Sequence, residues 1–269
     1  MRRRLWRLLL VALLAAVTVA GCGGEGDEAQ RPTAPGEADA VVEGQETVEA
    51  PAAVEDDEAY TEARERMVEQ GIVGLGIEDE AVIAAMEAVP RHRFVPTEYL
   101  AQAYENHPLP IGFGQTISQP YIVALMTEEA QVDAGDVVLE VGTGSGYQAA
   151  VLAEIVDHVY SLEIIGGLAE RAEGTLQDLG YENVTVRNAD GYFGWEEQAP
   201  FDAILVTAAP DHIPQPLVDQ LKVGGRMIIP VGPVGGFQTL WRVTKVGEDE
   251  VQSEDLGGVR FVPLTREEE

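Results

Sequence analysis

The hydrophobic positions along this chain change their period near Gly135. Before it, helices are predicted over 61–70 and 78–89, and in the second of them apolar residues recur at helical spacing. After it, short apolar runs alternate with longer stretches of helical periodicity. The apolar runs predict strands over 137–141, 159–163, 184–187, 201–207 and 227–231. The helical stretches cover 147–155, 168–179 and 216–221.

The order of these elements indicates the class of fold. Strands that alternate with helices form a parallel sheet with helices on both faces. Gly180 directly follows the helix predicted over 168–179 and is expected to end it as a C-terminal cap. Two further β-like runs, 238–246 and 259–264, follow with no convincing helix between them. We therefore predict an α/β domain whose mostly parallel sheet has an antiparallel C-terminal edge.

The N-terminus has the layout of a secretory signal. Four arginines within the first seven residues precede 13 uncharged, mostly apolar residues over 8–20. That stretch is short compared with the roughly 20 residues that cross a bilayer. The only cysteine, Cys22, ends the run Val19-Ala20-Gly21-Cys22, which resembles the bacterial lipoprotein box. The resemblance implies a lipid-modified Cys22, and the alternative is an ordinary signal peptide with an incidental cysteine.

Residues 23–58 separate this leader from the predicted folded region. They contain 12 acidic residues and one basic residue, are rich in Pro, Ala and Gly, and include no aromatic residue. Such a composition buries too little apolar surface to fold. The chain is therefore predicted to comprise a lipoprotein signal peptide with its cysteine (1–22), a disordered acidic tether (23–58) and one folded domain (59–269).

Acidic residues dominate the charge of the whole chain. Its 269 residues include 47 acidic side chains against 17 lysines and arginines, for a formal net charge of -30. This charge repels phosphate polymers, so nucleic acid is not expected as a partner. A single cysteine permits neither an intramolecular disulfide framework nor a cysteine-based zinc site. We expect no metal centre.

A glycine-rich turn follows the first strand of the α/β region. It contains Gly142, Thr143, Gly144 and Gly146 in the order G-x-G-x-G, and a helix is predicted directly after it. Glycines at such a turn let a ligand approach the backbone closely. Tyr147 stands where the dinucleotide fingerprint has its third glycine, and no Gly-Lys-Ser/Thr sequence follows. Neither of the common phosphate-binding loops therefore matches this turn.

Acidic residues at strand ends indicate which ligand the turn binds. Glu140 precedes the turn, and together they resemble the first motif of the AdoMet-dependent methyltransferases, whose cofactor carries a sulfonium cation. Glu163 ends the next strand, where a carboxylate can accept both hydroxyls of a ribose. Asp190 and Gly191 close the third strand, and Asp190 is suited to accept an adenine amino group. The plain alternatives are a charge partner for a helix end at Glu140, a solvated carboxylate at Glu163 and a simple Asp-Gly turn.

A glycine-rich polar segment, residues 108–124, precedes the glycine turn. Its sequence is PLPIGFGQTISQPYIVA, in which Pro120 is suited to be the first residue of a helix. A loop at this point can close over the carboxyl edge of the sheet. Ser118 and Gln119 stand just before Pro120, and spacing alone favours a role for them as helix caps.

This segment resembles, nearly residue for residue, the signature of the protein-L-isoaspartate O-methyltransferases. The resemblance extends over about 65–265 and includes VPRHRFVP (89–96), FDAILVTAA (201–209) and VRFVPL (259–264) in the family's order. It implies a Rossmann-like AdoMet-dependent methyltransferase fold. The implied reaction methylates the α-carboxylate of L-isoaspartyl residues in damaged proteins, after which the ester closes to a succinimide and repair begins.

The resemblance also implies roles for individual residues. Ser118 is the implied catalytic residue, orienting the substrate carboxylate, and Thr116, Ile117, Arg260 and Val262 are implied to form the peptide site. The AdoMet site is implied at Glu140, Gly142, Thr143, Gly144, Gly146, Glu163, Asp190 and Gly191. The sequence departs from the family directly after Glu163, where Ile164-Ile165-Gly166-Gly167 replaces a segment that often begins with a basic residue.

Partners and location follow from the same observations. We expect a monomer that acts on isoaspartyl-containing proteins and peptides and is held on a membrane by a lipid at Cys22. The expected location is the bacterial cell envelope, although the family is otherwise usually cytoplasmic. Because AdoMet is made in the cytosol, two alternatives stay open. One is a methyltransferase of another carboxylate, and the other is an anchored module that has this fold but no turnover.

Overall fold

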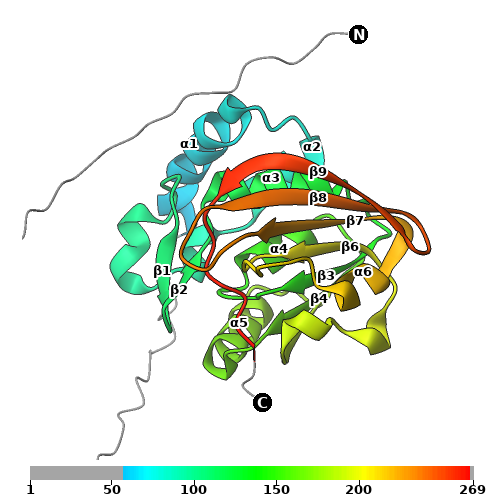
Figure 1. Ribbon diagram of the computed structural model, residues 1–269. Coiled ribbons are helices and arrows are strands. Elements are labelled where there is room, and N and C mark those ends of the chain that lie inside the picture. The colour runs from blue at the N-terminus through cyan, green and yellow to red at the C-terminus, as the bar shows by residue number, and fades with distance from the viewer. Residues whose placement is uncertain (1–56, 267–269) are drawn as a thin grey trace, which may run out of the picture. The chain divides into compact units, whose positions relative to one another are not determined.

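The computed structural model describes residues 57–266, and Figure 1 shows their elements. The predicted signal peptide, Cys22 and nearly all of the predicted tether lie outside the described residues. The part that precedes the sheet contains α1 (Thr61–Gly71), α2 (Glu80–Ala88), η1 (Asp57–Tyr60), η2 (Val73–Leu75), η3 (Arg91–Phe94) and η4 (Thr97–Gln102). No helix among the described residues is long and apolar enough to cross a membrane.

The two predicted N-terminal helices are confirmed to within two residues at each end. The side chain of Asp79 caps α2 by accepting the N–H groups of Ala81 and Val82 at 2.9 and 3.2 Å. At the other end, Val89 has extended backbone angles, as expected for the residue that precedes Pro90. The sequence pattern and the capping residues therefore agree on where this helix starts and stops.

A seven-stranded sheet in the order β5-β4-β3-β6-β7-β8-β9 forms the centre of the domain. Its parallel strands are β3 (Val137–Val141), β4 (His158–Glu163), β5 (Val184–Asn188), β6 (Phe201–Val206) and β7 (Leu221–Val231). The antiparallel edge consists of β8 (Gln238–Gly247) and β9 (Glu250–Val259). The predicted mostly parallel sheet with an antiparallel C-terminal edge is therefore confirmed. The strand order reverses between β3 and β6, which is where open α/β sheets bind ligands.

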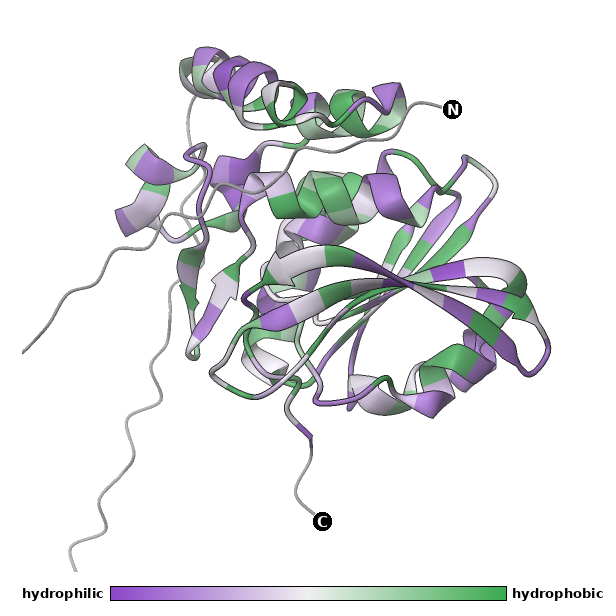
Figure 2. Cartoon of the chain, turned by 45° about the horizontal axis from the view of Figure 1, so that its top comes forward, coloured by the Kyte–Doolittle hydropathy of each residue, from purple (hydrophilic) through white to green (hydrophobic). Residues whose placement is uncertain are grey.

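Helices cover both faces of this sheet, as predicted. One face packs against α3 (Pro120–Ala130), α4 (Tyr147–Ala153) and α5 (Gly166–Asp178), with α1 and α2 outside them. The other face packs against α6 (Gln215–Asp219), beside η5 (Gly191–Phe193) and η6 (Glu196–Gln198). Figure 2 shows the outer helix α1 mostly in the hydrophilic colour and the inner helix α3 mostly in the hydrophobic colour. Burial of apolar helix faces against the sheet thus creates the two cores.

The C-terminal run is the main difference from the sequence prediction. Residues 259–264 were expected to form a strand, but β9 occupies Glu250–Val259 and ends where that run begins. Beyond β9 the chain leaves the sheet edge and forms only a bridge between Pro263 and Ala209. Proline has no N–H for a ladder, so the run cannot continue as a regular central strand. The apolar pattern of the run instead reflects its partial burial against the end of β6.

Burial of Leu221 explains where α6 ends, and a glycine explains where α5 ends. The helix predicted over 216–221 ends earlier, because Leu221 is buried and begins β7 opposite Phe201. Gly180 ends α5 as predicted, with φ +83°. Its N–H bonds to the Gln177 carbonyl and the next N–H bonds to the Leu176 carbonyl, both at 3.0 Å. This pair of bonds is typical of a Schellman cap.

The segment 108–124, predicted as a loop leading into a helix, contains a small antiparallel hairpin. Its strands are β1 (Leu109–Gly112) and β2 (Gln115–Ile117). Phe113 and Gly114 connect them with φ values of +52° and +70°, as a two-residue type I′ turn requires. Pro120 is the first residue of α3, as predicted. The hairpin and α3 together fix both ends of the short connection that carries Ser118.

Candidate active site

A pocket lies at the carboxyl ends of the central strands, at the point where the strand order reverses. Its empty volume is about 750 Å³ including the open mouth. Segments far apart in the sequence line it: 115–118 at the hairpin, 140–145 and 147–148 around the glycine turn, 162–165 at the end of β4, 207–208 after β6, and 262–265 near the C-terminus. Gly146 is not among the lining residues and faces Leu176 of α5. Most of the residues that the sequence singled out therefore lie around one cavity.

The glycine turn is held in a conformation that only glycine adopts easily. Gly142, Gly144 and Gly146 have φ values of +102°, +55° and +91°. A Cβ atom on Gly142 would come within 2.4 Å of the Thr207 hydroxyl oxygen. That hydroxyl donates to the Gly142 carbonyl at 2.6 Å. The turn is thus packed directly against the end of β6, and its backbone forms the floor of the pocket.

Glu163 connects the glycine turn with the start of α5. Its carboxylate accepts the Gly144 N–H at 2.8 Å and the Ile165 N–H at 2.9 Å, one at each oxygen. Only 6% of the residue is exposed, and it lines the pocket. Each carboxylate oxygen has a second lone pair, so the side chain can still accept hydroxyl groups from a ligand. The predicted contact with ribose remains a prediction that this geometry permits.

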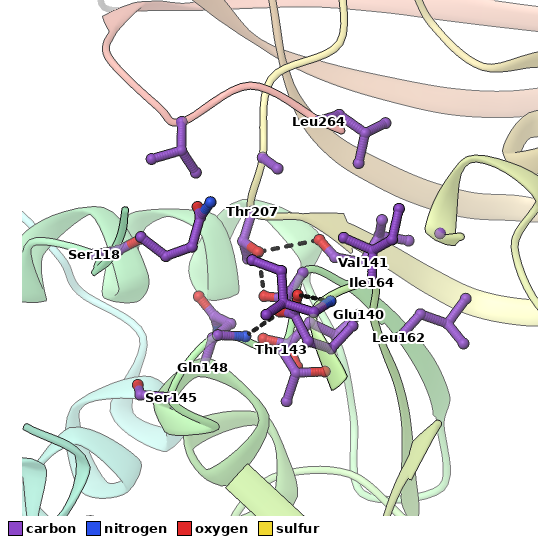
Figure 3. Close-up of a pocket in the computed structure, with 18 of the residues that line it drawn as sticks. Ser118, Glu140, Val141, Thr143, Ser145, Gln148, Leu162, Ile164, Thr207 and Leu264 are labelled. Carbon is purple, nitrogen blue, oxygen red and sulfur yellow. Dashed lines mark hydrogen bonds between the residues drawn. The ribbon is translucent and has the colours of Figure 1, made fainter. Parts of the chain in front are cut away.

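Glu140 lies deeper in the pocket than the sequence suggested. It is fully buried, and the Ser161 hydroxyl donates to its Oε2 at 2.5 Å. The Thr143 hydroxyl lies 2.6 Å from the same Ser161 oxygen. Figure 3 shows Glu140 and Thr143 among the residues that line the pocket. Oε1 is buried without a hydrogen-bond partner. Burial raises the pKa of Glu140 to about 8, the hydrogen bond from Ser161 opposes the rise, and the negative charge of Glu163 adds to it.

This pKa determines when Glu140 carries a negative charge. With a pKa of about 8, the carboxyl group is largely protonated at neutral pH in the protein without a ligand. A cation bound in the pocket would favour the ionised form, because opposite charges attract strongly where water is excluded. The protonation state of Glu140 is therefore expected to depend on what occupies the pocket.

The raised pKa of Glu140 predicts a pH-dependent stability. Between pH 4.5, its ordinary pKa, and about pH 8, the folded chain holds a proton that the unfolded chain has released. The contribution of this group therefore stabilises the fold at low pH and is lost as pH rises through about 8. Glu140→Gln should remove that loss, so the melting temperature of the variant should fall less than that of the wild type between pH 5 and 8.

Thermal melts at several pH values would measure this difference. Glu250→Gln is the matched control, because Glu250 is exposed on the edge strand β9 and its replacement should leave the pH profile unchanged. Profiles of Glu140→Gln and wild type that run parallel over the whole range would contradict the assignment.

Asp190 is engaged differently from the prediction. Its carboxylate accepts the Tyr192 N–H at 3.0 Å and pairs with the Arg266 guanidinium at 2.8 Å. The guanidinium carbon of Arg266 also lies 3.8 Å from the centre of the Tyr192 ring. Gly191 lines the pocket, whereas the side chain of Asp190 holds the C-terminal segment beside it. Its contact with adenine stays a prediction, and one of its carboxylate oxygens already has a cationic partner.

The hydroxyl of Ser118 is not used as a helix cap. Gln119 is the N-cap residue of α3 and makes no capping hydrogen bond with its side chain. The side chain of Asn106, from the segment before the hairpin, instead accepts the Tyr121 N–H in the first turn of α3 at 3.1 Å. The alternative in which Ser118 or Gln119 only caps the helix is therefore wrong for this structure.

Ser118 lies at the wall of the pocket. Its backbone carbonyl accepts a hydrogen bond from Arg91 at 2.8 Å, and among the described residues its hydroxyl bonds to no protein group. Figure 3 shows Ser118 on the side of the pocket opposite Leu162 and Ile164. Thr116 and Ile117 line the same wall, and Thr116 is exposed. The implied substrate side and the implied cofactor side thus meet across a single cavity.

The two C-terminal residues of the implied peptide site are placed differently from each other. Val262 lines the pocket, and its carbonyl accepts the Ala209 N–H at 2.8 Å. Arg260 does not line the pocket and lies over the Phe237 ring, 4.8 Å from its centre. Leu264 lies on the same segment as Val262 and also lines the pocket (Figure 3). The structure therefore brings Val262 to the pocket, and Arg260 is not among the residues that line it.

The segment after Glu163, in which the sequence departs from the family, contacts the hairpin. A Cβ atom on Gly167 would come within 2.7 Å of the far end of the Phe113 ring, so a larger residue there would require this side chain at the hairpin tip to shift. The Arg171 guanidinium also donates to the Ile111 carbonyl. Gly166-Gly167 therefore lies where the start of α5 contacts the hairpin, beside the cofactor side of the pocket.

Several pocket residues were not singled out by the sequence. Tyr147 and Gln148 belong to α4, and both are buried in the pocket wall. Ala208 and Thr265 line the pocket from the end of β6 and from the C-terminal segment. The positions of Tyr147 and Gln148 directly after the glycine turn could have suggested them. Contacts such as that of Arg91 with Ser118 link distant parts of the chain and leave no local signal.

The donor set of the pocket fits AdoMet. The glycine backbone allows close approach of a ligand, Glu163 has acceptor capacity for a ribose, and the orphaned Oε1 of Glu140 is a buried acceptor that a cation would stabilise. Among the described residues, no cluster of three or more His, Cys, Asp or Glu side chains could hold a metal ion. The fold and this pocket define an AdoMet-dependent methyltransferase.

Comparison with known proteins gives the family. Residues 62–269 match the family model described as Protein-L-isoaspartate(D-aspartate) O-methyltransferase (PCMT). A protein-L-isoaspartate O-methyltransferase of Opitutus terrae is 57% identical over 210 residues, which cover 78% of this chain and 89% of that protein. A solved protein-L-isoaspartate O-methyltransferase has a TM-score of 0.70 and 31% identity, covering 76% of this chain and 66% of the other.

A second solved structure, a beta-aspartate methyltransferase (PCMT) from Plasmodium falciparum in complex with S-adenosyl-L-homocysteine, has a TM-score of 0.66 and 26% identity. It is matched over 75% of this chain and 98% of its own length. The chain thus belongs to the protein-L-isoaspartate(D-aspartate) O-methyltransferase family. Its fold is the Rossmann-like methyltransferase fold, its cofactor is AdoMet, and its activity is the methylation of isoaspartyl residues.

Proposed function

We propose that this chain methylates the α-carboxylate of L-isoaspartyl residues at the pocket described above, with Ser118 orienting the carboxylate, and that it does so while anchored in a bacterial cell envelope. The observation that carries the first part is the Ser118 hydroxyl, which lies at the pocket wall with no hydrogen bond to a described protein group. A hydroxyl in that state is available to a substrate, because a polar group facing a closed cleft gains most from a charged partner.

The chemistry needs no general base. An isoaspartyl α-carboxylate has an ordinary pKa near 3.5 to 4 and is ionised at neutral pH. AdoMet, when bound, supplies the methyl group that a carboxylate oxygen receives to give the ester. The residues of this chain then have to bind, orient and shield the carboxylate. Holding reacting groups in the correct geometry can supply a large part of the rate enhancement.

Each side of the pocket supports one part of this task. On the substrate side, the Ser118 hydroxyl can donate to one carboxylate oxygen and leave the other free to react, while Ile117 contributes a buried apolar wall. On the cofactor side, Glu163 and the glycine turn form the binding surface. The C-terminal segment with Val262 lies across the same cavity and limits access of water.

Methyl transfer from labelled AdoMet to an isoaspartyl peptide would test the activity. The control is the same peptide with a normal aspartyl residue. We expect methyl incorporation into the isoaspartyl peptide alone, followed by base-labile release of label, because methyl esters hydrolyse readily. AdoMet binding with no incorporation into either peptide would indicate a binding module without turnover. Equal incorporation into both peptides would indicate a methyltransferase of other carboxylates.

The envelope location is supported by the N-terminal sequence. The run of four arginines, 13 uncharged residues and Cys22 has the order of a lipoprotein signal, and the acidic segment 23–58 is suited to hold a folded domain away from a membrane surface. Its 36 residues would span roughly 30 to 35 Å as a flexible coil, and charge repulsion would extend it further. We propose that the domain acts as a monomer on damaged proteins within its reach.

The anchor predicts that Cys22→Ala moves the protein from the membrane fraction to the soluble fraction. A cysteine that carries several acyl chains binds a membrane far more firmly than a single chain does. Fractionation followed by mass spectrometry of the mature N-terminus measures both the location and the modification. Gly24→Ala, two residues further on, is the matched control and should stay in the membrane fraction. An unmodified mature N-terminus downstream of Cys22 would contradict the proposal.

A further inference from the structure

Arg91 is an arginine that is completely buried within the domain. It begins η3 directly after Pro90, in the family motif VPRHRFVP, and 0% of the residue is exposed. Arginine is almost never fully buried unless a partner compensates its charge, because removal of a cation from water costs several kcal/mol. The groups around this side chain must therefore compensate for the loss of water, or the charge must serve a function.

The partners of Arg91 are neutral. Its Nε donates to the Ala103 carbonyl and its Nη2 to the Ser118 carbonyl, both at 2.8 Å. Its guanidinium carbon lies 4.7 Å from the centre of the Tyr147 ring. Among the described residues no carboxylate pairs with Arg91, and its Nη1 is buried without a hydrogen-bond partner. Burial lowers the pKa of Arg91 to about 10, so the side chain still carries its charge at neutral pH.

This buried charge stands directly behind the substrate side of the pocket. Ser118 and Tyr147, which both contact Arg91, line the pocket itself. Glu163 lines the same cavity, and the chain as a whole has a formal net charge of -30, so an incoming carboxylate meets a strongly acidic protein. A cation shielded from water acts over a longer range than one on the surface, because its field is weakly screened.

We propose that Arg91 is a positioning residue for methyl transfer, which fixes the Ser118 connection through its carbonyl and provides the positive potential that draws the substrate carboxylate to that wall. The inference rests on the proposed function of the pocket and assigns to the buried arginine a part in substrate selection. It also explains why an arginine, with several donors in one rigid plane, occupies the position. A single flexible ammonium group could not hold both carbonyls in the same geometry.

Two substitutions separate the charge from the hydrogen bonds. Arg91→Lys keeps the positive charge but loses the fork geometry, whereas Arg91→Met keeps much of the apolar volume and loses the charge. We expect kcat/KM for an isoaspartyl peptide to fall about tenfold in Arg91→Lys and about a hundredfold in Arg91→Met. The affinity for S-adenosyl-L-homocysteine, measured by calorimetry, should change less than about twofold in both. Arg93→Met, in the same turn but outside the pocket lining, is the control and should match the wild type.

A competition experiment tests the electrostatic role directly. Two peptides differ only in that one has the isoaspartyl α-carboxylate and the other has a carboxamide there. The wild type should bind the carboxylate peptide more tightly, and the preference should persist in Arg91→Lys but shrink in Arg91→Met. If Arg91 only stabilised the fold, its substitution would lower the melting temperature without changing this preference.

The outcomes distinguish this inference from the function on which it rests. Wild-type protein that does not methylate the isoaspartyl peptide would overturn the proposed function. An active wild type whose peptide preference and kcat/KM are retained by the folded Arg91 variants would overturn only the role of Arg91. If Arg91→Met does not fold, Arg91→Lys decides: unchanged kcat/KM, or cofactor affinity that falls in parallel with activity, contradicts the positioning role.

Discussion

Gly144→Val is expected to abolish AdoMet binding while leaving most of the fold intact. Gly144 has φ +55°, and its N–H donates to Glu163 at 2.8 Å on the floor of the pocket. A Cβ atom at this position would meet Ile111 at 3.5 Å and the Gly142 carbonyl oxygen at 4.0 Å, both ordinary distances, so the protein itself leaves room for it. The two γ-carbons of valine would extend beyond it, into space that the cofactor needs.

Gly144→Val should therefore have two separate effects, one on the stability of the fold and one on AdoMet binding. The left-handed backbone costs a non-glycine residue roughly 1 to 2 kcal/mol, and more for a β-branched one, which lowers stability. The occupied pocket should weaken AdoMet binding by at least about a hundredfold, or roughly 3 kcal/mol. Calorimetry with AdoMet and thermal melts on the same sample measure the two effects separately.

Gly180→Val is the matched control for this experiment. Gly180 also has a left-handed backbone, with φ +83°, and a Cβ atom there would meet nothing within 4 Å. It caps α5 outside the pocket lining. The control should therefore lose stability and keep its AdoMet affinity. A folded Gly144→Val protein that binds AdoMet as tightly as the wild type would remove Gly144 from the site.

The sequence predicts most of the sheet because its central strands are buried on both faces. Val137–Val141 is predicted to the residue, since a continuous apolar run between polar segments has one plausible length. The edge strand β9 leaves no such signal, because most of its residues are exposed and include several carboxylates. Pairing with β8 and the partial burial of Leu256 and Val259 hold the strand in place, so the apolar pattern instead predicts a strand in the run after it.

The site is predictable to the extent that it is local. The glycine turn and the carboxylates at strand ends lie within a few residues of recognisable elements, and the parallel topology brings them to one edge. The contacts that position Ser118 are long-range: Arg91 is 27 residues away, and Asn106 reaches Tyr121 from 15 residues away. The pairing of Arg266 with Asp190 spans 76 residues. No periodicity or motif records such pairs, so they emerge only from the folded arrangement.

Asn106 explains why a helix-cap argument failed at Ser118. The sequence places Ser118 and Gln119 before Pro120, where residues of this kind often satisfy the first N–H groups of a helix. In the structure the Tyr121 N–H is satisfied by Asn106, and proline has no N–H to satisfy. Because the need for a cap is met from elsewhere, the Ser118 hydroxyl is left for another role.

Ser118→Ala is expected to lower kcat/KM for an isoaspartyl peptide by roughly ten- to a hundredfold. Loss of one hydrogen bond to a charged group costs about 1.5 to 3 kcal/mol, and the loss appears in the rate if the bond is present in the transition state. AdoMet affinity should be unchanged, because Ser118 lies on the pocket wall opposite Leu162 and Ile164, on the implied substrate side. Stability should also change little, since the side chain caps no helix.

A residue that only stabilised α3 would give the reverse pattern. Its loss would cost about 1 kcal/mol of stability, visible as a lower melting temperature, with full specific activity in the folded fraction. Ser253→Ala, at an exposed position of β9, controls for the loss of a serine hydroxyl and should change neither quantity. Because the carboxylate needs no base, the pH profile of the Ser118→Ala enzyme should keep the wild-type shape at a lower rate. A less stable but fully active Ser118→Ala enzyme would refute the role of Ser118 at the substrate carboxylate.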